Sequence, residues 1–136
     1  MEQETNQQDS GLQEKSLQEN NLQPWGMKLK TFCMMMHLSQ LSSIVVPGLG
    51  LVLPIVMWAT NKDASPLIDA HGKNILNWLI SSLIYAGISL ILTLVFVGVI
   101  GLFAIGIMSL VFAIMGAVKA NDGVVWKYPC TITFLK

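Results

Sequence analysis

Charged and uncharged residues alternate along this chain in long blocks. No Asp, Glu, Lys or Arg occurs from Thr31 to Thr60 or from Asn74 to Val118, which makes uncharged runs of 30 and 45 residues. About 18 apolar residues are enough for a membrane-spanning helix. Each block has a glycine-containing break near its middle, at residues 47–50 and 98–101. The pattern predicts an all-α membrane protein in which four helical segments form two hairpins.

The breaks divide the apolar blocks into helices that we expect at about 25–46, 49–60, 66–97 and 101–120. Pro47 and Gly48 end the first helix, and Ser65 and Pro66 are typical of a helix N-cap and first position. The segment 49–60 would be about 18 Å long, whereas the hydrocarbon core of a bilayer is about 30 Å thick. This segment is therefore expected to be a thin span or half of a re-entrant hairpin. A single kinked helix over 27–60, crossing once, is the alternative.

Composition supports the membrane assignment. The chain has 136 residues, of which 53% are hydrophobic and 12% are charged. Soluble domains have roughly 25% charged residues, and a soluble core in so short a chain could not bury this much apolar surface. Formal net charge is zero, which gives no attraction to nucleic acid. We expect membrane lipids, and no nucleic acid, among its partners.

The lysines indicate the topology. In the two-hairpin arrangement every lysine after residue 24 lies on one side of the membrane, and the positive-inside rule makes that side cytoplasmic. Four tryptophans, at positions 25, 58, 78 and 126, are expected at the same interface. We therefore predict a multi-pass protein of the cell membrane with both termini in the cytoplasm. Six lysines are candidates for contact with anionic lipid, worth about 1 kcal/mol each: Lys28, Lys30, Lys62, Lys73, Lys119 and Lys127.

Two polar terminal regions flank the apolar blocks. Residues 1–23 are rich in Gln, Glu and Asn, a composition that predicts a disordered cytoplasmic tail. The membrane domain is expected to occupy residues 24–136. At its end, residues 121–123 form a turn signal, and we expect 121–136 to be an interfacial segment with a short hairpin. The two cysteines, Cys33 and Cys130, are expected to be reduced.

Polar residues inside the apolar blocks are the main candidates for function. In the first helix, Cys33, His37, Gln40 and Ser43 recur at spacings of four, three and three. His37 is expected to form a hydrogen bond with a neighbouring helix. The alternative is that it relays protons or binds a soft metal together with Cys33. The third helix offers polar residues for interhelical hydrogen bonds or, alternatively, a pore lining: Asn77, Ser81, Ser82, Tyr85, Ser89 and Thr93.

Small residues form one face of the last helix. They recur at spacings of three and four, and such a face lets a neighbouring backbone approach closely. We expect the neighbour to be the preceding helix of the same hairpin, and a homodimer seam is the alternative. The face consists of Gly106, Ser109, Ala113, Gly116 and Ala120.

The polar connection at residues 61–74 contains Asp69 and His71, two groups capable of acid–base chemistry. No nucleophile, glycine-rich phosphate loop or metal-ligand set accompanies them. We therefore predict that the protein is not an enzyme, and we assign it no catalytic residue, metal or cofactor.

A series of short motifs covers about residues 25–135. The motifs are His37-Leu38-Ser39, Pro47-Gly48-Leu49-Gly50, Leu53-Pro54-Ile55-Val56-Met57-Trp58, Ser65-Pro66, Asp69-Ala70-His71-Gly72-Lys73, Asn77-Trp78, Lys119-Ala120-Asn121-Asp122-Gly123 and Tyr128-Pro129. In this order they resemble small bacterial multi-pass membrane proteins of the Tic-twenty-like domain-of-unknown-function family. The resemblance implies a four-helix membrane protein without an assigned activity and, by analogy, an accessory role in protein translocation.

The sequence is compatible with three different functions. The first is a non-enzymatic membrane module that binds other membrane proteins or itself, as the small-residue face and one-sided charge indicate. The second is a small channel or transporter that uses the polar stripe around His37. The third is a sensor of anionic lipid that uses the six lysines.

Overall fold

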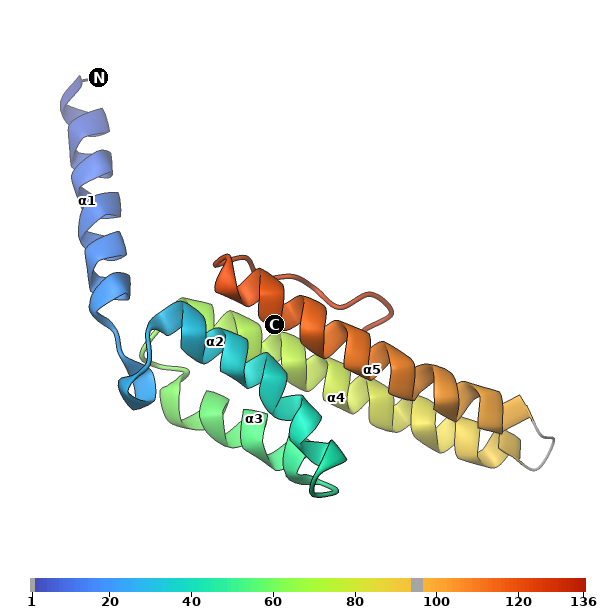
Figure 1. Cartoon of the computed structure of the whole chain (residues 1–136). Coiled ribbons are helices and arrows are strands. Elements are labelled where there is room, and N and C mark those ends of the chain that lie inside the picture. The colour runs from blue at the N-terminus through green and yellow to red at the C-terminus, as the bar shows by residue number, and fades with distance from the viewer. Residues whose placement is uncertain (1, 94–96) are drawn as a thin grey trace.

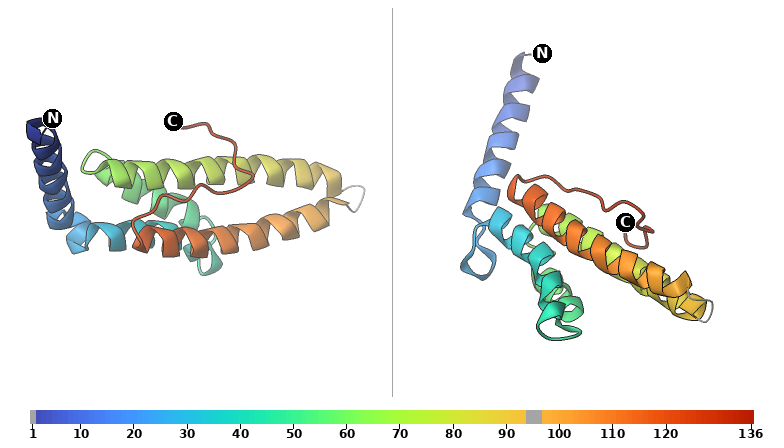
Figure 2. Two further views of the ribbon diagram at one scale, coloured as in Figure 1. Left: turned by 90° about the horizontal axis from the view of Figure 1, so that it is seen from above. Right: turned by 45° about the vertical axis from the view of Figure 1, so that its right-hand side comes forward.

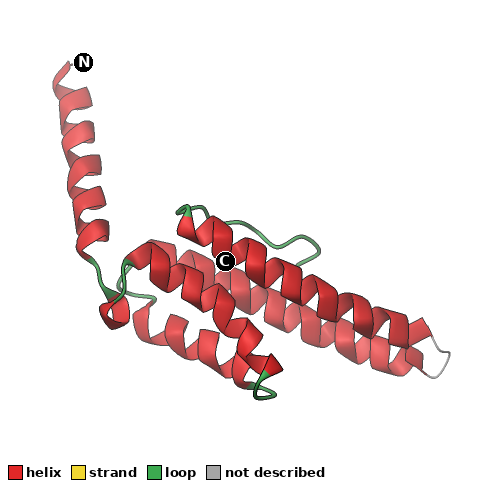
Figure 3. Ribbon diagram, in the orientation of Figure 1, coloured by secondary structure: helices red, strands yellow, loops and turns green. Residues whose placement is uncertain are grey.

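The computed structural model describes residues 2–93 and 97–136, and over these ranges it contains helices and no strand (Figures 1 and 3). This confirms the all-α prediction. The elements are α1 (Glu2–Asn21), η1 (Pro24–Gly26), α2 (Leu29–Leu38), η2 (Ser39–Ile44), α3 (Leu49–Asn61), α4 (Pro66–Leu92) and α5 (Val97–Asn121).

The two long helices, α4 and α5, lie antiparallel and side by side (Figures 1 and 2). Helix α4 begins where the sequence predicts, because the Ser65 hydroxyl accepts a hydrogen bond from the Leu67 amide at 3.2 Å. The predicted break at residues 98–101 is wrong, since these residues belong to α5. A Cβ atom at Gly98 would collide with the Ser89 carbonyl oxygen. This glycine therefore allows close helix packing and does not end a helix.

The first apolar block is less regular than the single helix predicted over 25–46. Trp25 and Gly26 have φ angles of 54° and 76°, so α2 starts only at Leu29. After Leu38 the chain tightens into the 3-10 helix η2, where the Ser39 hydroxyl donates to the Met36 carbonyl oxygen at 2.7 Å. Side-chain bonds of this kind compete with regular α-helix.

A tight turn follows η2 and reverses the chain. Gly48 has a φ of 91°, a left-handed conformation that glycine adopts without a steric penalty. Helix α3 then runs from Leu49 to Asn61, as predicted for 49–60. It returns the chain to the end of the molecule from which α2 started (Figure 1).

One apolar core joins the ends of four helices. Leu29 at the start of α2, Met57 near the end of α3, Ile68 near the start of α4 and Ala120 near the end of α5 belong to the same buried cluster. The ends nearest the charged residues therefore meet at one end of the molecule (Figure 2). This end is called the polar end below.

Helices α4 and α5 are long and apolar enough to cross a membrane. Only 28% of the most apolar stretch of α4 and 17% of that of α5 are buried inside the structure. The core helix of a soluble protein would be mostly buried, whereas here Leu90, Ile100 and Phe103 are 66%, 73% and 74% exposed. Such a large exposed apolar surface is suited to lipid.

The N-terminal tail differs from the predicted disorder. It is the helix α1, which projects away from the other helices (Figure 1). Gln, Glu, Leu and Lys have high intrinsic helix propensity, which explains the conformation. The side chains of Leu12 and Leu17 are 62% and 61% exposed, so α1 forms without burying apolar surface.

The C-terminal segment after α5 makes an irregular U-turn in place of the predicted short hairpin. It follows α4 as far as Tyr85, whose hydroxyl donates to the Cys130 carbonyl oxygen at 2.8 Å. Cys130 has a φ of 58°, and the chain then returns along α4 to Asn77. Side chains of α4 satisfy its backbone groups, so no strand pairing is needed.

Candidate functional site

A buried polar cluster joins α2, α4 and the C-terminal segment. His37 of α2, His71 of α4 and Tyr128 of the C-terminal segment are 1%, 0% and 3% exposed. The Nδ1 atom of His37 lies 2.5 Å from the Tyr128 hydroxyl, and its Nε2 atom lies 3.0 Å from Nδ1 of His71. We call these three residues and Gln40 the His–Tyr cluster.

The Gln40 amide donates to the Tyr128 hydroxyl oxygen at 3.1 Å. The Tyr128 hydroxyl can also donate. When it donates to Nδ1 of His37, the His37 proton is on Nε2 and is donated to Nδ1 of His71. Burial raises the pKa of Tyr128, and the Gln40 hydrogen bond opposes this only in part. Tyr128 therefore remains a protonated donor.

The chain of donors ends at Nε2 of His71. This atom is buried and has no hydrogen-bond partner among the described residues. A buried donor without an acceptor costs about 1–3 kcal/mol. The cluster thus combines three satisfied contacts with one unsatisfied donor.

Helix α5 closes the cluster through a glycine. A Cβ atom at Gly116 would collide with Nδ1 of His37 and would lie 2.8 Å from the Tyr128 hydroxyl. The absence of a side chain at this position lets α5 pack against both residues.

Aromatic rings hold the C-terminal segment beside the cluster. Trp78 and Phe112 have ring centroids 4.8 Å apart, and Trp126 and Tyr128 are 5.5 Å apart. Trp78 is 1% exposed and belongs to this packing. The expectation that it lies at the lipid interface is therefore wrong, because it is buried between helices and the C-terminal segment.

Polar residues along one face of α4 hold the backbone of the C-terminal segment. The side-chain Oδ1 atom of Asn77 accepts hydrogen bonds from the backbone amides of Phe134 and Leu135 at 2.9 and 2.7 Å. Ser81 accepts from the Ile132 amide at 2.9 Å. Asn74 contacts the Trp126 carbonyl oxygen, and Tyr85 bonds to Cys130 as described above. The structure thus brings Asn77, Ser81 and Tyr85 together on a segment that is not a helix.

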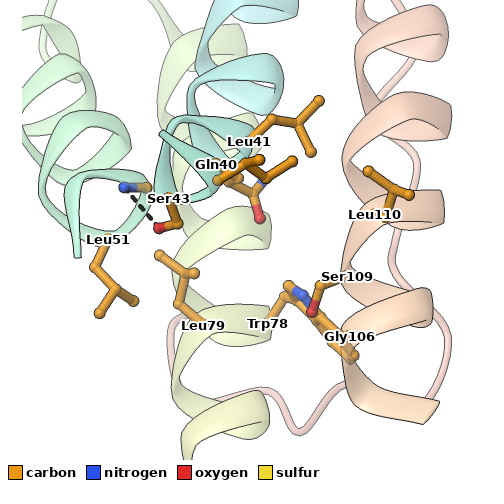
Figure 4. Close-up of a pocket in the computed structure, with 11 residues that line it drawn as sticks. Gln40, Leu41, Ser43, Leu51, Trp78, Leu79, Gly106, Ser109 and Leu110 are labelled. Carbon is orange, nitrogen blue, oxygen red and sulfur yellow. Dashed lines mark hydrogen bonds between the residues drawn. The ribbon is translucent and has the colours of Figure 1, made fainter. Parts of the chain in front are cut away.

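The small-residue face of α5 contacts two different surroundings. Ala113, Gly116 and Ala120 are buried, with Gly116 against His37 of α2. The neighbour of this half is α2 as well as the expected α4. Gly106 and Ser109 instead border an open cavity of about 360 Å³ between η2, α3, α4 and α5, with Gln40 on its opposite wall (Figure 4).

The candidate lipid-binding lysines lie on or near the helix ends that meet at the polar end. Lys73 forms an ion pair of 2.6 Å with Asp69, which also accepts a hydrogen bond from Trp58 at 3.0 Å. Lys62 lies 4.9 Å from the Trp58 ring centroid. Lys28 and Lys30 begin α2, Lys119 is in the last turn of α5, and Lys127 follows that helix.

The His–Tyr cluster contains few side chains that could bind a metal ion. In the described part of the chain no three His, Cys, Asp or Glu side chains converge as a metal site would require. Cys33 is buried and Cys130 is exposed, and both are free thiols.

Sequence reasoning missed the roles of His71, Asn74 and Tyr128. His71 and Asn74 share a face of α4 with Ser81 and Tyr85, because successive spacings are three, seven and four. This spacing indicates that these polar residues lie on one face of the helix. Nothing local identified Tyr128 as the partner of His37, which is 91 residues away in the sequence.

The exposed apolar helices and the polar end define the class, a helical membrane protein. The family of magnetosome magnetite crystal formation proteins, MamF/MmsF, matches residues 28–135, and the chain belongs to this family. No curated protein and no solved structure matches the chain.

The family match corrects the resemblance to Tic-twenty-like proteins, which is wrong. Several of the short motifs behind that resemblance lie at turns and helix ends, such as Pro47-Gly48 and Ser65-Pro66. Proline and glycine recur at such positions in unrelated helical proteins for conformational reasons. The suggested role in protein translocation depended on the resemblance and is abandoned with it.

Proposed function

We propose that the protein is a non-enzymatic, multi-pass membrane component of magnetite crystal formation whose polar end binds other membrane proteins or a second copy. The family assignment indicates the process in which the protein takes part, magnetite crystal formation. The observation that carries the interaction role is the separation of surfaces: exposed apolar residues along α4 and α5, and charged residues at the polar end.

In this proposal the helices form two hairpins with both termini on the cytoplasmic side. The meeting of four helix ends in one core, at Leu29, Met57, Ile68 and Ala120, supports the arrangement. The proposed location is the membrane of the magnetosome in place of the cell membrane, and its support is the family description, which names magnetosome magnetite crystal formation.

Charge supports an interaction surface at the polar end. Residues 24–136 contain seven lysines and three aspartates, a net charge of +4, whereas residues 1–23 contain five acidic residues and one lysine, a net charge of −4. These opposite charges cancel, so the net charge of the whole chain is zero. A basic surface steers acidic partners towards it, and α1 of a second copy has the complementary charge. Anionic lipid headgroups would be attracted by the same lysines.

The alternative of a channel built around His37 has no support from the described contacts. His37 is buried and both of its ring nitrogens have hydrogen-bond partners. A pore-lining group would face water.

Topology is tested by thiol labelling of the Cys130→Ser variant after expression in a bacterial cell membrane, in sealed right-side-out vesicles whose interior is the cytoplasmic side. Ala64→Cys, in the connection between α3 and α4, should resist a membrane-impermeant reagent added outside and react once the vesicles are opened. Gly11→Cys in α1 should behave in the same way. Reaction of either site in the sealed vesicles would refute the topology.

Interaction is tested by crosslinking in native membranes followed by purification in mild detergent. The double variant Lys28→Gln with Lys62→Gln should lose crosslinked species that the native protein forms. The double variant Lys28→Arg with Lys62→Arg keeps both charges and is the matched control, which should retain the crosslinked species. Recovery of only a monomer from native membranes would count against the proposal.

A further inference from the structure

The two pairs of helices reach different depths. Helix α3 has 13 residues, whereas α4 has 27 and α5 has 25. At a rise of 1.5 Å per residue, α3 is about 20 Å long and the other two are about 40 Å. Both pairs start from the same core at the polar end. The segment α2–η2–α3, called the short hairpin, therefore ends about halfway along α4 and α5.

The cavity in Figure 4 shows how far along α4 and α5 the tip of the short hairpin reaches. Ser43 and Leu51 of the short hairpin share this cavity with Leu79 of α4 and Gly106 of α5. Beyond this level α4 continues to Leu92. The distal parts of α4 and α5 project past the short hairpin (Figure 1).

The tip of the short hairpin is apolar. Ile44, Val45 and Val46 are 75%, 83% and 50% exposed, and no charged residue lies between Thr31 and Thr60. A turn in water would expose polar side chains, as the connection between α3 and α4 does with Lys62 and Asp63. The apolar tip is suited to the interior of the bilayer.

Several backbone groups of the tip have partners within the short hairpin. The amides of Val45 and Val46 donate to the Ser42 carbonyl oxygen at 3.1 and 3.0 Å, and the Leu49 amide donates to the Val46 carbonyl oxygen at 3.1 Å. The Gly50 amide donates to the Ser43 hydroxyl at 2.9 Å. Irregular backbone at membrane depth is tolerated where protein covers it or where it lines a cavity, and Ser43, Ile44 and Gly50 line the cavity of Figure 4. These features favour a tip that ends in hydrocarbon, short of the far surface.

The C-terminal segment lies along α4 from the polar end as far as Tyr85, about 28 Å from the start of that helix. Its deepest contact is that of Cys130 with Tyr85, and its amides are bonded to Asn77 and Ser81. Ile132 and Phe134 are 42% and 49% exposed and can face lipid. This segment adds to the cross-section mainly on the polar side of the tip of the short hairpin, and its turn reaches about two helical turns further along α4.

We propose that the protein favours membranes that are convex towards its polar end. In the described part of the chain, four helices and most of the C-terminal segment lie on the polar side of the tip of the short hairpin, whereas α4, α5 and the turn of that segment lie beyond it. Since a helix is about 10–12 Å across, the protein is a wedge that expands one leaflet more than the other. The inference depends on the proposed topology, in which the polar side is cytoplasmic. A small intracellular vesicle has this curvature.

Curvature preference is measured with the purified full chain, labelled with a fluorophore at Ala64→Cys in the Cys130→Ser background, in vesicles of mixed size. Only molecules whose label is quenched from outside are counted, because these have the polar end on the convex side. Their density per membrane area should be at least about twofold higher in small vesicles than in large ones, since shallow insertion is curvature-sensitive. Equal density would overturn the inference.

A lengthened hairpin is the matched variant. Apolar helix-forming residues inserted on both sides of Val45–Gly48 would let the short hairpin cross the bilayer and remove the asymmetry. This variant should insert but lose the enrichment in small vesicles. Retained enrichment would also overturn the inference, because the short hairpin would then not be its cause.

The depth of the tip is tested separately with Val46→Cys in the same background. This thiol should resist an impermeant reagent from both sides of sealed vesicles and react in detergent. Reaction from the side opposite to Ala64→Cys would refute the half-membrane hairpin while leaving the proposed topology intact. Failure of the Ala64→Cys test would refute the topology itself.

Discussion

The Tyr128 hydroxyl lies 2.5 Å from Nδ1 of His37, and this contact joins the C-terminal segment to the first helix of the membrane domain. Because Gln40 donates to the same hydroxyl, the contact also orients the imidazole towards His71. A segment without regular secondary structure therefore contributes a central residue of the buried polar cluster.

Tyr128→Phe should destabilise the folded protein by about 1–3 kcal/mol, because Nδ1 of His37 would be left buried without a donor. Thermal unfolding of the protein in detergent measures the effect. Tyr85→Phe is the control, since it removes a hydrogen bond to Cys130 that is exposed, and its effect should be smaller. An equal loss in both variants would show that burial of the Tyr128 contact is unimportant.

Gly116→Ala should also destabilise the protein, by about 1–3 kcal/mol, because the added methyl group would overpack the space beside His37 and Tyr128. Gly106→Ala is a close control in the same helix, where an added Cβ meets nothing within 4 Å. It should be neutral or stabilising, because alanine has the higher helix propensity. Loss of self-association in Gly106→Ala would instead support a homodimer seam at this position.

Asn77→Ala should release the end of the C-terminal segment from α4. The amides of Phe134 and Leu135 lose their acceptor, so their hydrogen exchange should become faster. Mass spectrometry of the C-terminal peptide measures this rate. Ser82→Ala is the control, because the Ser82 hydroxyl bonds only within α4, to the Leu79 carbonyl oxygen. Unchanged exchange in Asn77→Ala would contradict the role assigned to Asn77.

Removal of residues 1–21 should leave the stability of the remaining chain unchanged within about 0.5 kcal/mol, as expected for the loss of surface contacts. Helix α1 exposes Leu12 and Leu17, and from residue 6 to its end none of its residues is buried. Thermal unfolding in detergent tests this expectation. A clear loss of stability would show that α1 packs on the other helices.

The all-helical fold and the positions of most helices could be predicted from the uncharged blocks. The limits of α3 and the N-cap at Ser65 depend on local signals, a proline–glycine turn and a serine–proline pair, and these acted as expected. The limits of α5 could not be predicted in this way. Gly98 looks like a break in the sequence, but its role is steric and depends on the Ser89 carbonyl oxygen of another helix.

The candidate site could be predicted only in part. His37, Gln40, Asn77 and Ser81 were recognisable because a polar residue in an apolar block needs a partner. Their partners were not recognisable, since hydrogen bonding depends on positions in space.

The sequence by itself determined that the chain is helical and apolar, because long uncharged runs are read from residues that are neighbours in the chain. Only the tertiary structure decided that the C-terminal segment turns at Cys130 and brings Tyr128 to His37. It also decided that the short hairpin ends beside the middle of α4 and α5. The physical reason is that packing and buried hydrogen bonds join residues that are far apart in the sequence, and no local pattern records which of them will meet.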